Sequence, residues 1–349
     1  NIRAYVDNAA SMLRWMTANT PVVYTAQPYP DYHAENAGGS PTGYRTHLPE
    51  MLDGKPLGND LRSQRMPSPA ASLFGYLNWT FAETYDMLYR PRGWWWRFSI
   101  NMARYWLDLP FRFTSRKDRR LTLGNALTGG LRLALNKKAV PMWLKSPLAE
   151  LVEQDGRVVG AVITRDGRPY RIRARKGVIL AAGGFDKDQA KRDAYSPLYP
   201  KAQVSGGVTS NTGDALVAGL SMGAGTMNLQ SAWAAPVFHV PGEDRGRLCT
   251  IERALPGCIM VNQSGTRYLN EAASYHVTGQ EMARREAEHG DASPSWMVFD
   301  YRYRHLFPMG PVYPLIPDWA QNGMVRTVLK KARTIPELAA RMGIDPDAL

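Results

Sequence analysis

The sequence predicts a mixed helix–strand fold of the α/β or α+β class, and three observations support this prediction. Its 349 residues allow two or three domains at roughly 100–200 residues each. Several stretches carry apolar residues at helical spacing, whereas three short runs between 147 and 174 have the character of β-strands. A content of 44% hydrophobic and 21% charged residues excludes an intrinsically disordered chain.

Composition also limits the setting and the classes of site. No run approaches the ~18 consecutive apolar residues that a transmembrane helix needs. The two cysteines, Cys249 and Cys258, are too few for a disulfide framework, and no C-x-x-C pair indicates a metal or redox site. We therefore expect a reducing, cytoplasmic compartment and no metal.

The N-terminal part begins with a regular element and continues irregularly. Apolar residues at helical spacing predict an amphipathic helix over Ile2–Asn19. Residues 20–70 are rich in Pro, Gly, Asp and Asn, as binding loops often are. Tyr24, Tyr29 and Tyr32 form the aromatic centre of that stretch.

Residues 94–109 predict a second helix with strong aromatic and basic character. Its apolar side holds Trp95, Phe98, Met102, Tyr105, Trp106 and Leu109. Nine basic residues between Arg90 and Arg120 supply more than half of the net charge of +12. A helix of this kind suits a membrane interface, although packing on its own domain or on a partner subunit is the commoner role of an aromatic face. No nucleic-acid-binding module accompanies the charge, so we expect no nucleic acid partner.

The central part alternates between strand and helix signals. A helix is expected over 121–138, followed by strands at 147–152, 158–164 and 170–174. The turns Asp155-Gly156 and Asp166-Gly167 between them are strong hairpin signals. The apolar run in 177–185 reads as a buried parallel strand, and its glycine pair allows a close approach to the backbone. Further helices are predicted near Thr212 and, from a capping box, after Thr334.

Four motifs in this order resemble the fumarate-reductase/3-ketosteroid-dehydrogenase class of FAD flavoproteins. They are KGVILAAGGF, SNTGDALVAGLSMGAG, AWAAPVF and ERALPGCIMVNQSGTRYLNEAASYHVTG. The resemblance implies FAD as cofactor and a Rossmann-like FAD/NAD(P)-binding domain with a three-stranded meander, followed by a substrate-capping catalytic domain. The expected domains are 1–235, with a basic aromatic helical insertion near 70–120, and 236–349. The G-x-G-x-x-G turn and the C-terminal flavin segment of that class are missing, so we expect the middle portion of a longer protein.

The resemblance assigns two segments to FAD. Their residues are Ala182, Gly183, Gly184, Asn211, Thr212, Gly213 and Asp214. The first segment is also compatible with a plain strand ending in a turn. Asp214 in the first turn of a helix is also compatible with simple stabilisation of the helix dipole.

The pattern Asn-Glu-Ala-x-x-Tyr at 270–275 resembles the ketosteroid branch, in which that tyrosine faces the steroid. This implies Tyr275 as the base that removes a proton beside a ketone while hydride leaves the neighbouring carbon for flavin N5. Tyr32 is the implied catalytic partner, and Tyr29 is the alternative. Trp233, Phe238 and Tyr268 would suit an apolar, steroid-like ketone.

The expected partners are that substrate, an external electron acceptor and a membrane surface reached through residues 90–112. The alternative function is a flavin-dependent reductase of an activated double bond, in which Arg253 or His239 would supply the proton.

Overall fold

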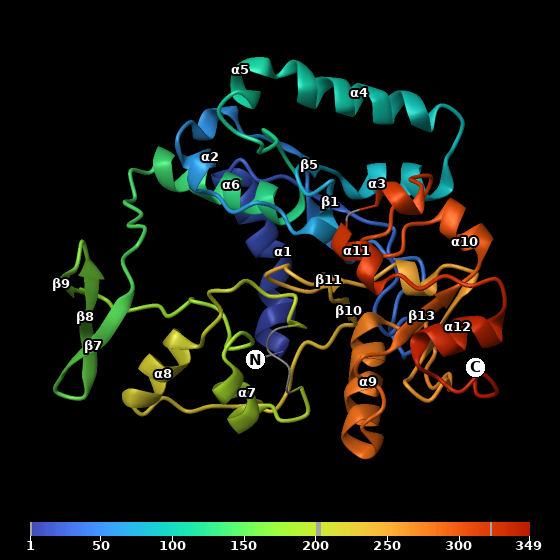
Figure 1. Cartoon of the computed structure of the whole chain (residues 1–349). Helices are drawn as coiled ribbons and strands as arrows, with labels where there is room; N and C mark the ends of the chain where they lie inside the picture. Colours follow the sequence, from blue (N-terminus) through green and yellow to red (C-terminus); the bar gives the residue numbers. More distant parts are fainter. Residues whose placement is uncertain (1, 200–203, 322) are drawn as a thin grey trace. The chain divides into compact units, whose positions relative to one another are not determined.

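A computed structural model describes residues 2–199, 204–321 and 323–349 of the chain (Figure 1). The chain divides into two compact units, Asn1–Pro141 and Met142–Leu349. This division reflects how compactly each part is packed and does not mark a functional boundary. The boundary predicted near residue 235 stays a prediction. Within the described ranges, no helix is both long enough and apolar enough to cross a bilayer.

The first unit is mainly helical. Its described helices are α1 (Ile2–Asn19), α2 (Asp60–Ser63), α3 (Phe81–Tyr89), α4 (Trp94–Leu107), α5 (Leu109–Arg112) and α6 (Leu123–Lys137), with 3-10 turns at Lys55–Leu57 and Pro69–Ala71. Its short strands pair antiparallel as β1 (Tyr24–Ala26) with β2 (His47–Pro49), β3 (Leu52–Asp53) with β6 (Arg120–Leu121), and β4 (Ser72–Leu73) with β5 (Leu77–Asn78). A small core of Leu57, Leu61, Leu121 and Ala126 joins α2 and α6.

The two predicted N-terminal helices form, but their faces differ from expectation. α1 spans the predicted residues, yet none of its side chains is buried. In α4 Tyr105 of the predicted apolar side is buried, and so is Asn101, a polar residue outside that side. Asn101 donates to Glu83 Oε1 at 2.8 Å, and the Tyr105 hydroxyl donates to the Arg116 carbonyl at 2.8 Å. Polar partners inside the unit therefore decide which side of α4 is buried.

The second unit combines small antiparallel sheets with short helices. The sheets are β7 (Leu148–Gln154), β8 (Arg157–Arg165) and β9 (Arg168–Arg173) in that order, β10 (Val237–Phe238) with β11 (Arg247–Leu248), and β12 (Cys258–Val261) with β13 (Trp296–Phe299). The described helices are α7 (Gln189–Tyr195), α8 (Asp214–Ser221), α9 (Tyr275–His289), α10 (Tyr301–Leu306), α11 (Gly323–Val328) and α12 (Ile335–Met342), with 3-10 turns at Glu252–Ala254 and Asp318–Ala320.

Local sequence signals account for the turns of this unit. Asp155 and Gly156, and likewise Asp166 and Gly167, have positive φ at the two hairpins of the three-stranded sheet. Such left-handed pairs connect antiparallel strands without splaying them. α12 begins at the predicted Thr334 cap, whose side chain accepts a hydrogen bond from Glu337 N.

The prediction of a buried parallel strand within 177–185 is wrong for this structure. The run carries no strand, and Ile179 is 92% exposed. An apolar run forms a buried strand only beside other strands, and the described residues supply no neighbour for it. All strand pairs of the described chain are antiparallel, so the Rossmann-like parallel sheet is not seen there.

Candidate active site

The structure brings the two predicted flavin segments into contact. The Gly213 N–H donates to the Gly184 carbonyl at 3.0 Å. Gly183 has φ +86°, and a Cβ there would lie 2.6 Å from Asn211 Oδ1, so the side chain of any other residue would collide with the second segment. Residues 182–184 are exposed to solvent. Together these residues form an open stretch of backbone.

Asp186 holds this arrangement together and was not predicted from the sequence. Its carboxylate accepts a hydrogen bond from Asn211 Nδ2 at 2.8 Å and another from the Ser205 hydroxyl. Lys187 N also donates to the Asn211 carbonyl at 3.0 Å. The partners lie up to 25 residues apart in sequence, so local pattern gives no signal for them.

Asp214 is exposed at the first residue of α8. The Thr212 hydroxyl donates to its Oδ1 at 2.9 Å, which fixes the carboxylate beside the open glycine segment. Gly213 occupies the N-cap position and supplies no side-chain cap. An oriented carboxylate beside accessible backbone can accept hydrogen bonds from hydroxyl groups. The residues therefore fit the hydroxyl-bearing chain of a flavin cofactor.

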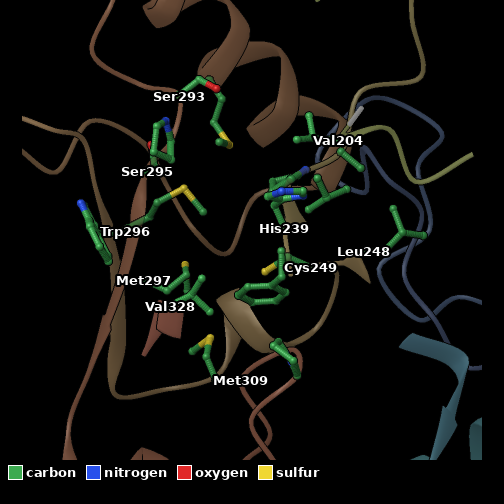
Figure 2. Close-up of a pocket in the computed structure, with 18 of the residues that line it drawn as sticks. Val204, His239, Leu248, Cys249, Ser293, Ser295, Trp296, Met297, Met309 and Val328 are labelled. Atoms are coloured by element: carbon green, nitrogen blue, oxygen red, sulfur yellow. The ribbon is translucent and has the colours of Figure 1, made fainter. Parts of the chain in front are cut away.

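A cavity of about 1900 Å³ includes Gly184 and Phe185 in its lining. It exceeds the roughly 300–1000 Å³ of most small-molecule pockets. Much of its wall is apolar, including Phe238, Trp296, Met297, Met309, Val312 and Val328. Figure 2 shows Met297, Met309 and Val328 around the cavity with Cys249 and His239. Burial raises the pKa of the Cys249 thiol well above its usual range, so this wall behaves as an apolar one.

Helix α9 connects the cavity to the predicted base. Gly279 and Met282 of this helix line the cavity, and the half-buried Tyr275 lies one turn before Gly279 on the same face. A Cβ at Gly279 would lie 2.7 Å from Ala235 N, so only glycine allows α9 to pack this closely on the 234–235 backbone.

A buried arginine holds the loop that leads into α9. Arg253 is only 3% exposed, and it donates to the carbonyls of Glu271 and Ala273, the latter at 2.6 Å, and to that of Cys249 at 3.2 Å. These bonds direct the guanidinium to the backbone just before Tyr275. They favour a positioning role over the alternative role of proton donor.

Glu271 ties the same loop to β12. Its carboxylate accepts from Met260 N at 2.8 Å and from Arg267 Nη2 at 2.6 Å. Burial alone would raise the pKa of Glu271, but the hydrogen bonds from Arg267 and Met260 lower it. The carboxylate is thus kept charged, and the start of α9 is connected to a paired strand.

The remaining predicted residues are distributed between the two units. Tyr32 and its alternative Tyr29 belong to the first unit and Tyr275 to the second, so their pairing stays a prediction. His239, Trp233 and Phe238 line the cavity. Tyr268 exchanges a hydrogen bond with the Ser295 hydroxyl at 2.8 Å. Among residues 2–199, 204–321 and 323–349, no group of three or more His, Cys, Asp or Glu side chains is placed to hold a metal ion.

Comparison with known proteins agrees with this arrangement. Residues 1–349 match the family described as FAD binding domain. The chain is 31% identical to a 3-oxosteroid 1-dehydrogenase of Mycolicibacterium smegmatis, over 99% of this chain and 61% of that protein. It is 33% identical to a 3-oxosteroid 1-dehydrogenase of Comamonas testosteroni, over 91% of this chain and 56% of that protein.

A solved structure matches nearly the whole fold. The crystal structure of 3-ketosteroid delta1-dehydrogenase from Sterolibacterium denitrificans, in complex with 1,4-androstadiene-3,17-dione, has a TM-score of 0.88 and 35% identity. The match covers 99% of this chain and 63% of that chain. The chain thus spans less than two thirds of the length of these relatives.

Proposed function

Since the chain belongs to the FAD binding domain family, we propose that it serves an FAD-dependent dehydrogenase acting on a steroid-like apolar ketone. The reaction introduces a C=C bond next to the ketone. The names of the similar proteins, which are 3-oxosteroid 1-dehydrogenases, support both the substrate class and the reaction.

One observation carries the proposal: a single apolar cavity is bounded by the candidate flavin segment and by the helix of the candidate base. Gly184 of the flavin segment and Gly279 of α9 both line it. A cavity with apolar walls binds an apolar ring system through burial of its surface. Such a substrate would then lie between the cofactor and Tyr275.

In this mechanism Tyr275 accepts the proton from the carbon beside the ketone, and Tyr32 assists as its partner. Residues 182–184 and 211–214 would hold FAD, which when bound supplies the acceptor for the hydride from the neighbouring carbon. The substrate loses one proton and one hydride in total, and the two electrons pass on to an external electron acceptor. Arg253 and Glu271 hold the loop before Tyr275 and keep the base in place.

The same proposal names the partners and the setting. They are the apolar ketone, the external electron acceptor and a membrane surface contacted through residues 90–112, in a cytoplasmic compartment. The exposed apolar side chains of α4 and α5 support the membrane contact.

Tyr275→Phe tests the function because it removes one oxygen and keeps the ring. We expect turnover of a 3-ketosteroid to fall by about 10²–10⁴-fold, as for the loss of a general base, while flavin absorbance and steroid binding change little. Tyr303→Phe is the control, since that buried hydroxyl donates to the carbonyls of Glu252 and Pro308. It should cost about 1 kcal/mol of stability and leave turnover nearly intact. Near-normal turnover of Tyr275→Phe would contradict the assignment and make Tyr32 the next residue to test.

A further inference from the structure

A smaller pocket of about 240 Å³ shares most of its lining with the large apolar cavity. We call it the side pocket, and it is lined by Asp318, Trp319, Arg326, Leu329 and Lys331. All of these residues except Arg326 also line the large cavity, as does the neighbouring Lys330. The side pocket therefore adjoins the space in which the proposed function places the substrate.

A single carboxylate in the side pocket is shared by two cations. Asp318 pairs with Arg304 Nη2 at 2.9 Å and with Lys331 Nζ at 2.9 Å. The hydrogen bonds from Lys331 and Arg304 lower the pKa of Asp318, so the carboxylate is charged at neutral pH. One negative charge cannot balance two positive charges, and this group of three side chains therefore carries a net positive charge.

Arg326 and Lys330 add further positive charge. Both are exposed, and the two ion pairs formed here within the described chain include neither of them. The other carboxylates that line the large cavity accept hydrogen bonds from the protein itself: Asp186 from Asn211 Nδ2 at 2.8 Å, Glu286 from Ala292 N at 2.9 Å and Asp300 from Tyr303 N at 2.8 Å. The side pocket is thus cationic, whereas much of the large cavity is apolar.

Buried hydrogen bonds hold the loop that precedes Asp318. Arg304 donates to the carbonyls of Tyr313 at 2.9 Å and Ile316 at 2.6 Å. Gln321, only 5% exposed, donates through Nε2 to the same two carbonyls at 3.1 and 2.8 Å. Because one arginine binds both this loop and Asp318, the position of the carboxylate is fixed together with the cavity wall.

We propose that the side pocket binds a carboxylate carried by the apolar ketone on a substituent away from its reacting carbons. The inference rests on the proposed function, in which the apolar ring system occupies the large cavity. Arg326 and Lys330 donate charge-assisted hydrogen bonds to the carboxylate, and Lys331 adds to the positive potential. Trp319 and Leu329 contact the hydrocarbon part of the substituent. The preferred substrates are therefore ketone acids, ahead of neutral ketones of the same size.

The test compares two ligands that differ in charge: a 4-ene-3-ketosteroid whose side chain ends in a carboxylate, and the methyl ester of the same compound. Isothermal titration calorimetry with the full chain measures both dissociation constants without turnover. We expect the acid to bind about 5–10-fold more tightly at low salt, because each exposed ion pair contributes a modest attraction. This preference should shrink as salt is added, and it should largely disappear in the double variant Arg326→Gln, Lys330→Gln.

The matched control is the double variant Arg302→Gln, Arg333→Gln. Both arginines are exposed, and neither lines the side pocket or the large cavity, so the preference for the acid should be retained. Unchanged melting temperatures show that both double variants are folded. Equal binding of acid and ester by the wild type, or an equal loss of preference in both double variants, would overturn the inference.

Turnover of the methyl ester tests the proposed function separately. Its absence, with the preference for the acid intact, would contradict the dehydrogenase activity and still support the anion-binding side pocket. Normal turnover of the ester without any preference for the acid would overturn the side pocket and leave the dehydrogenase activity standing.

Discussion

Two apolar runs of the second unit have similar residues, but only one of them forms a buried strand. Residues 178–182 are Val-Ile-Leu-Ala-Ala and form no strand, with Ile179 92% exposed. Cys258–Val261 is Cys-Ile-Met-Val and forms β12, with Val261 1% exposed. The second run pairs along its whole length with Trp296–Phe299, whereas the described chain provides no such partner for the first.

The difference teaches that apolar composition defines a candidate for burial, and a neighbouring strand decides whether burial occurs. It also separates the two halves of the proposed site. The flavin side relies on open backbone at 182–184, while the substrate side rests on β12, Glu271 and Arg253. Substitutions on the two sides should therefore affect different properties of the protein.

The largest stability effect is expected in the paired run. Val261→Ala removes buried methyl groups and leaves a cavity, which should lower the free energy of unfolding by about 2 kcal/mol. Ile179→Ala removes more atoms but from an exposed position, so the change should stay within about 0.5 kcal/mol. Urea denaturation of both variants measures the contrast. Equal destabilisation would show that 178–182 is buried in solution.

An intermediate effect is expected for the carboxylate that supports β12. Glu271→Gln loses the charge that binds Arg267, so we expect a loss of about 1–2 kcal/mol at neutral pH. Because folding lowers the pKa of Glu271, its contribution is present above its ordinary value and is lost as the pH falls through the folded-state value.

The free energy of unfolding of the wild type, measured from pH 7 downward, should therefore decrease below about pH 5. The decrease should be smaller in the Gln variant. The same pH dependence in both proteins would contradict the role of the Glu271 charge.

The smallest stability effect is expected on the flavin side. Asp214→Ala removes an exposed carboxylate and should change the free energy of unfolding by no more than about 0.5 kcal/mol, while flavin retention falls. The ratio of flavin to protein absorbance and the melting temperature, measured on one sample, distinguish this from a helix-dipole role. A lower melting temperature with full flavin content would support the dipole role instead.

Local patterns predicted the elements whose stability is local. The helical spacing of Ile2–Asn19 and the Asp-Gly turns of the three-stranded sheet act within a few residues, and the structure has them where the sequence places them. The interpretation of 177–185 was wrong because burial of a strand depends on residues elsewhere.

The supports of the candidate site were missed for the same reason. Arg253 reaches the Glu271 carbonyl across 18 residues, and Asp186 binds Asn211 across 25. Asp186 stands outside the recognised motifs, and Arg253 was considered only as a proton donor because nothing local in the sequence shows that its side chain is buried against the backbone. The cavity walls come from separate loops and short strands, so no single segment of the sequence predicts the cavity.

Gly279 has a consequence for how the protein can change through evolution. The helix that begins with Tyr275 touches the 234–235 backbone where a methyl group would already collide, so almost any mutation of this codon pushes the helix away from its support. Substitution of Gly279 is therefore not a route by which the shape of the cavity can change without moving α9. Adaptation to substrates of another shape would have to proceed through other lining residues, such as the flexible Met297 and Met309, which tolerate exchange far more readily.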